Sequence, residues 1–193
     1  MREVEVKFRV ADGRAVIAVL GARGIEFGPA ARQDDLAYAP AGWEFGDGRL
    51  GVAFLRLRTV DGRHFFALKQ PGANAQACLE HETEIADRGQ MHQAILRMGY
   101  RPAVRIAKTR RAASDSDVAL CLDDLDGVGT FLELERMVPE HVPAEAVQDG
   151  LAAYVDALGI EGERVHETYD TLAHAAALAA GGRGMDASGA PWY

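Results

Sequence analysis

The sequence predicts one α+β domain built on a closed antiparallel β-barrel, or tunnel, of about eight strands with flanking helices. Most predicted strands alternate apolar and charged residues, which gives each strand one apolar and one charged face. Several charged faces carry a single sign of charge, a poor arrangement for a solvent-facing surface. A sheet that closes around these charges, so that they pair or hold a charged ligand, explains the pattern better. An open sheet with a solvated charged face is the alternative.

Composition limits the possible partners. The chain has 193 residues, of which 48% are hydrophobic and 26% charged, as expected for one globular domain with a sizeable core. The formal net charge of −8 argues against a nucleic-acid partner. It leaves room for an anionic small molecule, because a few cations in one cleft can hold a polyanion on an acidic protein. We expect a single domain over 1–180 and a flexible, glycine-rich tail over 181–193.

The expected location is the cytoplasm, with no membrane partner. No apolar run approaches the roughly 18 residues of a membrane span, and the first ten residues alternate instead of forming a signal peptide. The two cysteines, Cys78 and Cys121, form no CxxC pair and read as ordinary buried thiols of a reducing compartment.

Periodicity and turn signals predict the order of the elements. We expect a strand over 2–10, a helix over 13–22, strands near 25–28 and 32–38, a loop over 39–51, a hairpin of 52–60 and 64–70, a strand over 79–86, a helix over 88–98, strands over 102–112, 117–123 and 129–137, and helices over 144–158 and 167–179.

The first elements rest on alternation and capping. Residues 2–10 alternate strictly between charged and apolar, the period of a half-buried strand. Asp12 is a suitable N-cap for the first helix, and Gly21 and Gly24 mark its end. The stretch 39–51 is rich in glycine and predicts a loop.

The later elements rest on turn signals. Asp61-Gly62 is a strong two-residue turn that predicts a hairpin. Asp87 is a suitable N-cap for the second helix, whose apolar residues recur at helical spacing until Gly99. The segment DDLDGVG joins the last two long strands.

The charged faces contain the groups needed for phosphate and metal binding. Lysine and arginine donate hydrogen bonds to phosphate oxygens, and the candidates are Arg56, Arg58, Lys69, Lys108 and Arg110. Carboxylates supply the hard oxygens that magnesium or manganese prefers, and the candidates are Glu3, Glu5, Glu133 and Glu135. A site with both predicts metal-assisted phosphoryl or nucleotidyl transfer.

The same residues resemble a known family. EVEVKFRV, at the N-terminus, resembles the ExExK signature of the CYTH superfamily, the triphosphate tunnel metalloenzymes. The segments that follow in the family's order are LRLR, ALKQPG, ETE, AKTRR, CLDDLDGVGTFLELE and HETYDTLA. The resemblance spans residues 3–173. Within the superfamily, EVEVKFRVAD and AILRMGYRPAVRIAKTRR are most similar to class IV adenylyl cyclases.

The resemblance implies a closed β-tunnel, commonly dimeric, that converts ATP to cyclic AMP and pyrophosphate with two magnesium or manganese ions. It implies metal binding by Glu3, Glu5, Glu133 and Glu135. It implies triphosphate binding by Lys7, Arg56, Arg58, Lys69, Lys108 and Arg110, with Glu82 and Glu84 at acidic positions whose use varies between branches. Asp123 matches an acidic residue of the active-site wall, and the catalytic set becomes Glu3, Glu5, Lys7 and Asp123.

Two other functions remain open. The same scaffold could hydrolyse inorganic triphosphate, thiamine triphosphate or a nucleoside triphosphate, or it could bind nucleotide or polyphosphate without turnover. The chain also departs from the family: Ala37 replaces the usual tyrosine, and the insertion within 39–51 is a candidate to shape one mouth of the tunnel. Neither reaction needs a side-chain nucleophile, and Tyr169 is interpreted as a packing or capping residue.

Overall fold

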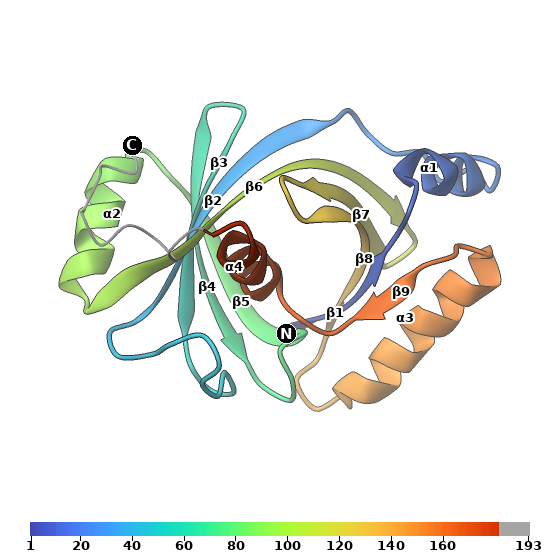
Figure 1. The fold of residues 1–193 in the computed structure, drawn as a ribbon. Helices are drawn as coiled ribbons and strands as arrows, with labels where there is room; N and C mark the ends of the chain where they lie inside the picture. Colours follow the sequence, from blue (N-terminus) through green and yellow to red (C-terminus); the bar gives the residue numbers. More distant parts are fainter. Residues whose placement is uncertain (182–193) are drawn as a thin grey trace.

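The computed structural model describes residues 1–181. Figure 1 shows its elements in chain order: β1 (Arg2–Arg9), α1 (Gly13–Gly21), β2 (Ala31–Pro40), β3 (Phe54–Val60), β4 (Arg63–Pro71), β5 (Ala77–Ile85), α2 (Arg88–Arg97), β6 (Tyr100–Asp115), β7 (Val118–Leu125), β8 (Gly129–Val138), α3 (Ala144–Leu158), β9 (Glu163–Val165) and α4 (Tyr169–Ala179).

The sheet closes into an eight-stranded antiparallel barrel, as predicted. Neighbouring strands follow the order β5-β4-β3-β2-β6-β7-β8-β1, and β1 pairs back onto β5. That closing pair is short, with Glu3 opposite Cys78 and Val4 opposite Ala77. Further along the same strand, Lys7 pairs with Val165 of β9. Strands β5 and β9 divide this edge of β1 between them, so the closing strand β5 covers only its N-terminal end.

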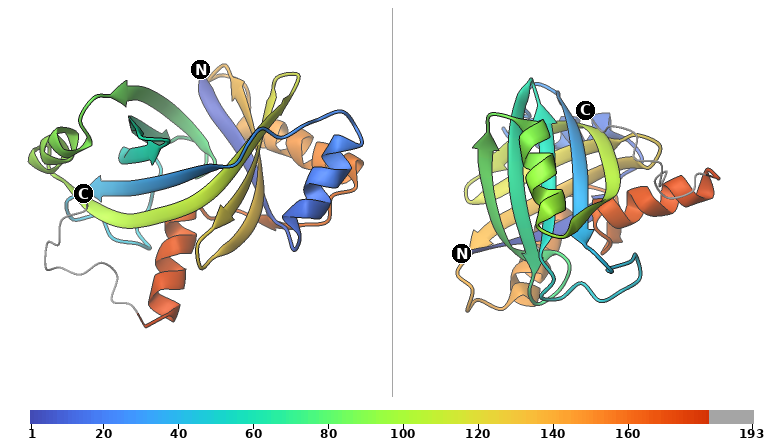
Figure 2. Two further views of the ribbon diagram at one scale, coloured as in Figure 1. Left: turned by 90° about the horizontal axis from the view of Figure 1, so that it is seen from above. Right: turned by 90° about the vertical axis from the view of Figure 1, so that its left-hand side faces the viewer.

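The apolar faces of the strands point outward, under the helices. Helices α1 and α3 lie on one side of the barrel and α2 on the other, as Figure 1 and the left view of Figure 2 show. Val6 and Leu134 pack with Leu151 of α3 in one buried cluster. Leu57 packs with Ile95 of α2 in another. Because successive strand residues face opposite sides, burying the apolar residues outside places the charged residues inside.

The predicted caps and hairpin are confirmed. The side chain of Asp12 accepts a hydrogen bond from the N–H of Arg14, and that of Asp87 accepts one from the N–H of Gln90. At the tip of the β3–β4 hairpin, Asp61 and Gly62 both have positive φ, 50° and 76°. Two-residue hairpin turns of this kind require that conformation, which glycine and aspartate tolerate.

One predicted strand is wrong, and one short strand was not predicted. Residues 25–28 form no strand. The N–H of Ile25 donates back to the carbonyl oxygen of Leu20 at 3.0 Å, and that of Gly28 donates to the carbonyl oxygen of Ala112 at 2.8 Å, so no ladder forms. The sequence also gave no sign of β9, because three residues are too few to show a period of two. It forms where β5 leaves the edge of β1 unpaired.

The remaining differences lie at the ends of elements. Strand β6 starts at Tyr100, before Pro102, and the ladder shifts register between Ala37 and Tyr38, next to that proline. A proline cannot donate to a ladder, so an irregular position accommodates it.

No helix within residues 1–181 is long and apolar enough to cross a membrane. The predicted flexible tail lies outside the described residues, except for Gly181.

Candidate active site

The barrel encloses a cavity of about 410 Å³, within the roughly 300–1,000 Å³ range of small-ligand sites. All but two of the site residues predicted from the sequence line it: Glu3, Glu5, Lys7, Arg56, Arg58, Lys69, Glu82, Lys108, Arg110, Glu133 and Glu135. The two that do not are Glu84 and Asp123. The period-two charged faces therefore converge on one shared space.

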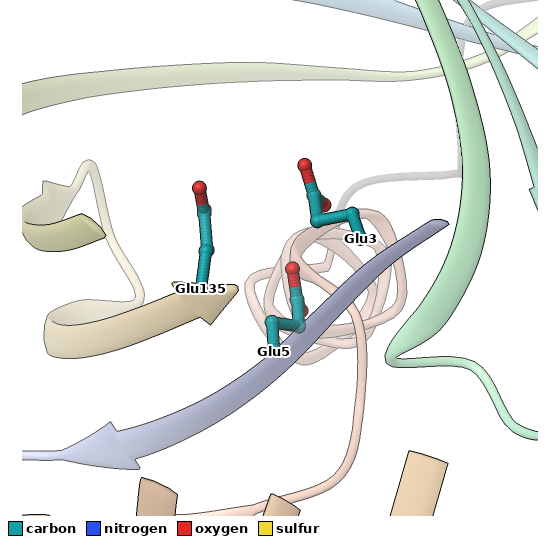
Figure 3. A group of neighbouring side chains, drawn as sticks. All are labelled: Glu3, Glu5 and Glu135. Carbon is teal, nitrogen blue, oxygen red and sulfur yellow. The ribbon is translucent and has the colours of Figure 1, made fainter. Parts of the chain in front are cut away.

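Three carboxylates meet on the wall made by β1 and β8. Figure 3 shows Glu3, Glu5 and Glu135 pointing into the same region, and one oxygen of each lies within 4.8 Å of the others. Glu3 and Glu5 share a face because they are two residues apart, and Glu135 is the ladder partner of Glu5. The pKa of Glu3 rises to about 8, since burial and the charges of Glu135, Glu80 and Glu5 outweigh Lys69.

This cluster fits a divalent cation. Burial also raises the pKa of Glu135, with Glu133 and Glu5 adding to the effect against Arg110. Three hard oxygen donors that repel one another suit magnesium or manganese, which are bound by a few carboxylates with water and substrate phosphates. Glu133 is not part of this cluster. It accepts a hydrogen bond from Arg110 at 2.6 Å and forms an ion pair with Lys7 at 3.2 Å. The geometry favours Glu3, Glu5 and Glu135 as metal ligands.

The pKa of Glu3 leads to a test of stability against pH. A folded pKa of about 8, above the ordinary 4.5, means that protonated Glu3 favours the fold. That contribution is complete below about pH 4.5 and is lost as pH rises through about 8. Urea unfolding in EDTA, from about pH 5 to 9, should show stability falling less steeply in Glu3→Gln than in the wild type. The exposed Glu26→Gln serves as the control. Equal slopes in Glu3→Gln and the wild type would contradict the prediction.

A ladder of ion pairs continues from the carboxylate cluster across β4 and β3. Lys69 bridges Glu3 at 2.9 Å and Glu80 at 2.8 Å. Arg56 then bridges Glu80 at 3.0 Å and Glu82 at 2.8 Å. Although burial raises the pKa of Glu80, Lys69 and Arg56 lower it to about 2. Glu80 shares the charged face of Glu82 in the sequence but was left out of the predicted site.

Arg58 has a separate partner, Asp35 on β2. Its Nε and Nη2 donate to the two oxygens of Asp35 at 2.8 and 2.7 Å, a two-pronged pair between ladder neighbours. Burial opposes ionisation of Asp35, but the hydrogen bonds and charge of Arg58 lower its pKa to about 2. Asp35 is therefore a site residue that sequence reasoning missed.

Asp123 lies behind the cavity wall and fixes two of its cations. It is fully buried and accepts hydrogen bonds from Arg110 Nε at 2.7 Å and from Lys108 Nζ at 3.2 Å. Burial and the neighbouring Arg110 lower the pKa of Lys108 to about 8, against the charge of Asp123. The ring of Tyr169 packs on the same group, with its centroid 4.2 Å from Lys7 Nζ and 4.7 Å from Lys108 Nζ. Tyr169 is therefore a packing residue, as predicted, and the groups that it packs against are two cations of the site.

Glu84 lies outside the cavity. Its side chain is 49% exposed and pairs with Arg63. It shares the strand face of Glu80 and Glu82, but by that point β5 has passed beyond the cavity lining. The alternation predicts the face of a residue and not its depth, so Glu84 is left out of the proposed site.

Comparisons with known proteins agree with this geometry. A family model, the CYTH domain, matches residues 1–169, from before β1 to the first residue of α4. A protein of Methanocaldococcus jannaschii named "putative adenylate cyclase" is 28% identical over 167 residues, which cover 86% of this chain and 94% of that protein. The residues that the family model matches include all the strands, β1 to β9.

Solved structures share the fold. A conserved hypothetical protein from Pyrococcus furiosus superposes with a TM-score of 0.73 at 21% identity, covering 88% of this chain and 99% of that one. HpAC1 from Hippeastrum, named a "putative adenylyl cyclase" with a dominant triphosphatase activity, superposes with a TM-score of 0.58 at 18% identity, covering 95% and 97%. At these identities the similarity supports the fold alone.

Proposed function

Since the chain belongs to the CYTH domain family, we propose that it is a metal-dependent enzyme that converts ATP to cyclic AMP and pyrophosphate. One observation carries the proposal: six cationic side chains from strands and a three-carboxylate cluster face a single cavity. The cations are Lys7, Arg56, Arg58, Lys69, Lys108 and Arg110. A triphosphate is the small ligand that needs both many cations and a bound divalent ion.

The residues of the chain bind and orient the phosphates. Arginines can donate two parallel hydrogen bonds to phosphate oxygens, and lysines act as point charges. Arg110 and Lys108 are held in place by Asp123 before substrate arrives, so little reorganisation is needed when charge moves onto a leaving pyrophosphate. A divalent ion bound by Glu3, Glu5 and Glu135 would lower the pKa of a coordinated hydroxyl and neutralise phosphate charge.

Two reactions, cyclisation and hydrolysis, fit the same cavity residues. The similarity to the Methanocaldococcus jannaschii protein supports cyclisation. The cations of the lining suit inorganic triphosphate as well as a nucleoside triphosphate, because their hydrogen bonds go to phosphate oxygens that both ligands share. Hydrolysis of inorganic triphosphate or of a nucleoside triphosphate is therefore the second candidate. Either reaction uses the same cations, and they differ in whether a ribose hydroxyl or water is placed in line with phosphorus.

A product assay decides between them. Purified protein is incubated with ATP and manganese, in parallel with inorganic triphosphate and manganese, and the products are separated by chromatography. We expect cyclic AMP and pyrophosphate from ATP. ADP or AMP with phosphate, and no cyclic product, would replace cyclisation by hydrolysis. Tight triphosphate binding without any product, under every divalent metal tried, would leave only a binding module.

A further inference from the structure

Arg49 is a seventh cation at the cavity, and it comes from an irregular segment. Residues 41–53 connect β2 to β3, and Arg49 from this segment lines the cavity. Its side chain is 18% exposed, and Nη2 contacts Asp170 Oδ2 at 2.8 Å. The segment therefore brings a guanidinium to a cavity whose other cations, among residues 1–181, all come from strands.

Two nitrogens of this guanidinium have no partner. Nε and Nη1 of Arg49 are buried and make no hydrogen bond within residues 1–181. The guanidinium carbon lies 4.1 Å from the ring centroid of Phe54 and 5.3 Å from that of Trp43. Buried donors without acceptors cost free energy, and guanidinium has donors only. Arg49 therefore brings two buried, unused donors to the cavity lining, where an acceptor that enters the cavity can use them.

Asp170 holds the guanidinium from the other side. It lies in the first turn of α4, where its Oδ1 accepts from the N–H of Thr171 at 3.1 Å and from the hydroxyl of Thr168. Only Oδ2 faces Arg49. The rings of Phe45 and His174 stack in parallel, 3.8 Å apart, and tie segment 41–53 to α4 a second time. Arg49 is thus fixed in position without its Nε and Nη1 being used.

We infer that Arg49 is a further phosphate-binding residue, whose Nε and Nη1 donate to an anionic oxygen of the bound triphosphate, and that Asp170 positions it. Phe54, on which the guanidinium rests, is the ladder partner of Lys69. Arg49 therefore extends the line of cations formed by Lys69 and Arg56. The inference rests on the proposed function in one respect, that the cavity binds a triphosphate.

The test measures binding of inorganic triphosphate by calorimetry, in EDTA and again with magnesium. Losing a charge-assisted pair of hydrogen bonds should weaken binding by about 10- to 100-fold in Arg49→Ala. Arg49→Lys keeps the charge without the fork and should fall between Arg49→Ala and the wild type. The matched control is Arg101→Ala, because Arg101 holds the same segment from outside the cavity through Glu44 and the carbonyl oxygen of Trp43. It should bind like the wild type, and thermal unfolding checks that every variant is folded.

Each outcome has one meaning. If the wild type binds triphosphate and folded Arg49→Ala and Arg49→Lys bind it equally well, the inference fails while the proposed function stands. If Arg101→Ala weakens binding as much as Arg49→Ala, the effect belongs to the segment and the inference is overturned. If the wild type itself binds no triphosphate with either addition, the proposed function fails and the inference falls with it.

The role of Asp170 has its own readout. Asp170→Asn should weaken binding less than Arg49→Ala, by about 3- to 10-fold, because the arginine remains but loses its anchor. The double variant should bind no more weakly than Arg49→Ala alone, since Asp170 acts through Arg49. Additive losses in the double variant would overturn the positioning role and leave the role of Arg49 to stand on its own measurement.

Discussion

Replacing Glu5 by glutamine is expected to lower turnover by more than about a hundredfold while leaving the fold intact. The change removes one negative charge from the group of Glu3, Glu5 and Glu135 and almost no volume. Substitution of outer residues that only orient metal ligands already costs about 10- to 100-fold, so loss of a ligand should exceed that. Initial rates with ATP and with inorganic triphosphate, at saturating manganese, measure the effect.

Metal binding separates this explanation from damage elsewhere. Titration of Glu5→Gln with manganese, followed by calorimetry or electron paramagnetic resonance, should show weaker binding than in the wild type. Glu161→Gln is the matched control, because Glu161 is exposed and does not line the barrel cavity. Wild-type rates in Glu5→Gln would rule out the proposed metal site, whatever reaction the enzyme performs.

Much of the cavity wall was predictable because a strand has a period of two. Val6 is buried under the helices, so its neighbours Glu5 and Lys7 must face the opposite side. The same argument places Arg56 and Arg58 inside when Leu57 is packed outside. Closure was favoured because faces with a single sign of charge suit an enclosed space that holds a charged ligand better than a solvated surface.

Sequence periodicity could not show which ions pair with which. Glu133 and Glu135 have the same period and face, yet Glu133 pairs closely with Lys7 and Arg110, at 3.2 and 2.6 Å. Glu135 lies 3.9 Å from Arg110 and joins the carboxylate cluster. That difference depends on ladder register and on which cations reach across the cavity, and neither can be read from the sequence of one strand. The prediction of Glu84 as a site residue is wrong for a related reason: alternation gives the face of a residue and not its distance from the cavity.

The contributions from irregular segments were out of reach for a different reason. Arg49 and Asp170 come from a loop and a helix end, where no repeat relates side-chain direction to sequence position. Only the final packing of α4 against segment 41–53 brings them together. The homodimer implied by the family resemblance and the cytoplasmic location expected from the sequence stay predictions.

Asp123→Asn is expected to lower the free energy of unfolding at pH 7 by about 3–5 kcal/mol, since breaking a buried ion pair leaves its partners uncompensated. Lys108 and Arg110 would lose the carboxylate that both contact. Asp124→Asn, the next residue on β7, is exposed and should change stability by less than about 0.5 kcal/mol. Urea unfolding of both variants measures the difference.

The pH dependence of that difference identifies its cause. Lys108 and Arg110 outweigh burial and hold the pKa of Asp123 well below its usual range. A lowered folded pKa stabilises the protein above the unfolded pKa of about 3.9, and this contribution disappears as pH falls. The gap between wild type and Asp123→Asn should therefore be widest near neutral pH and narrow below about pH 4. Because the charge of Asp123 raises the pKa of Lys108, its loss should lower the pKa of Lys108. Triphosphate binding should then begin to weaken at a lower pH in Asp123→Asn than in the wild type. A gap that stays constant down to acid pH would show that Asp123 acts through packing and not through its charge.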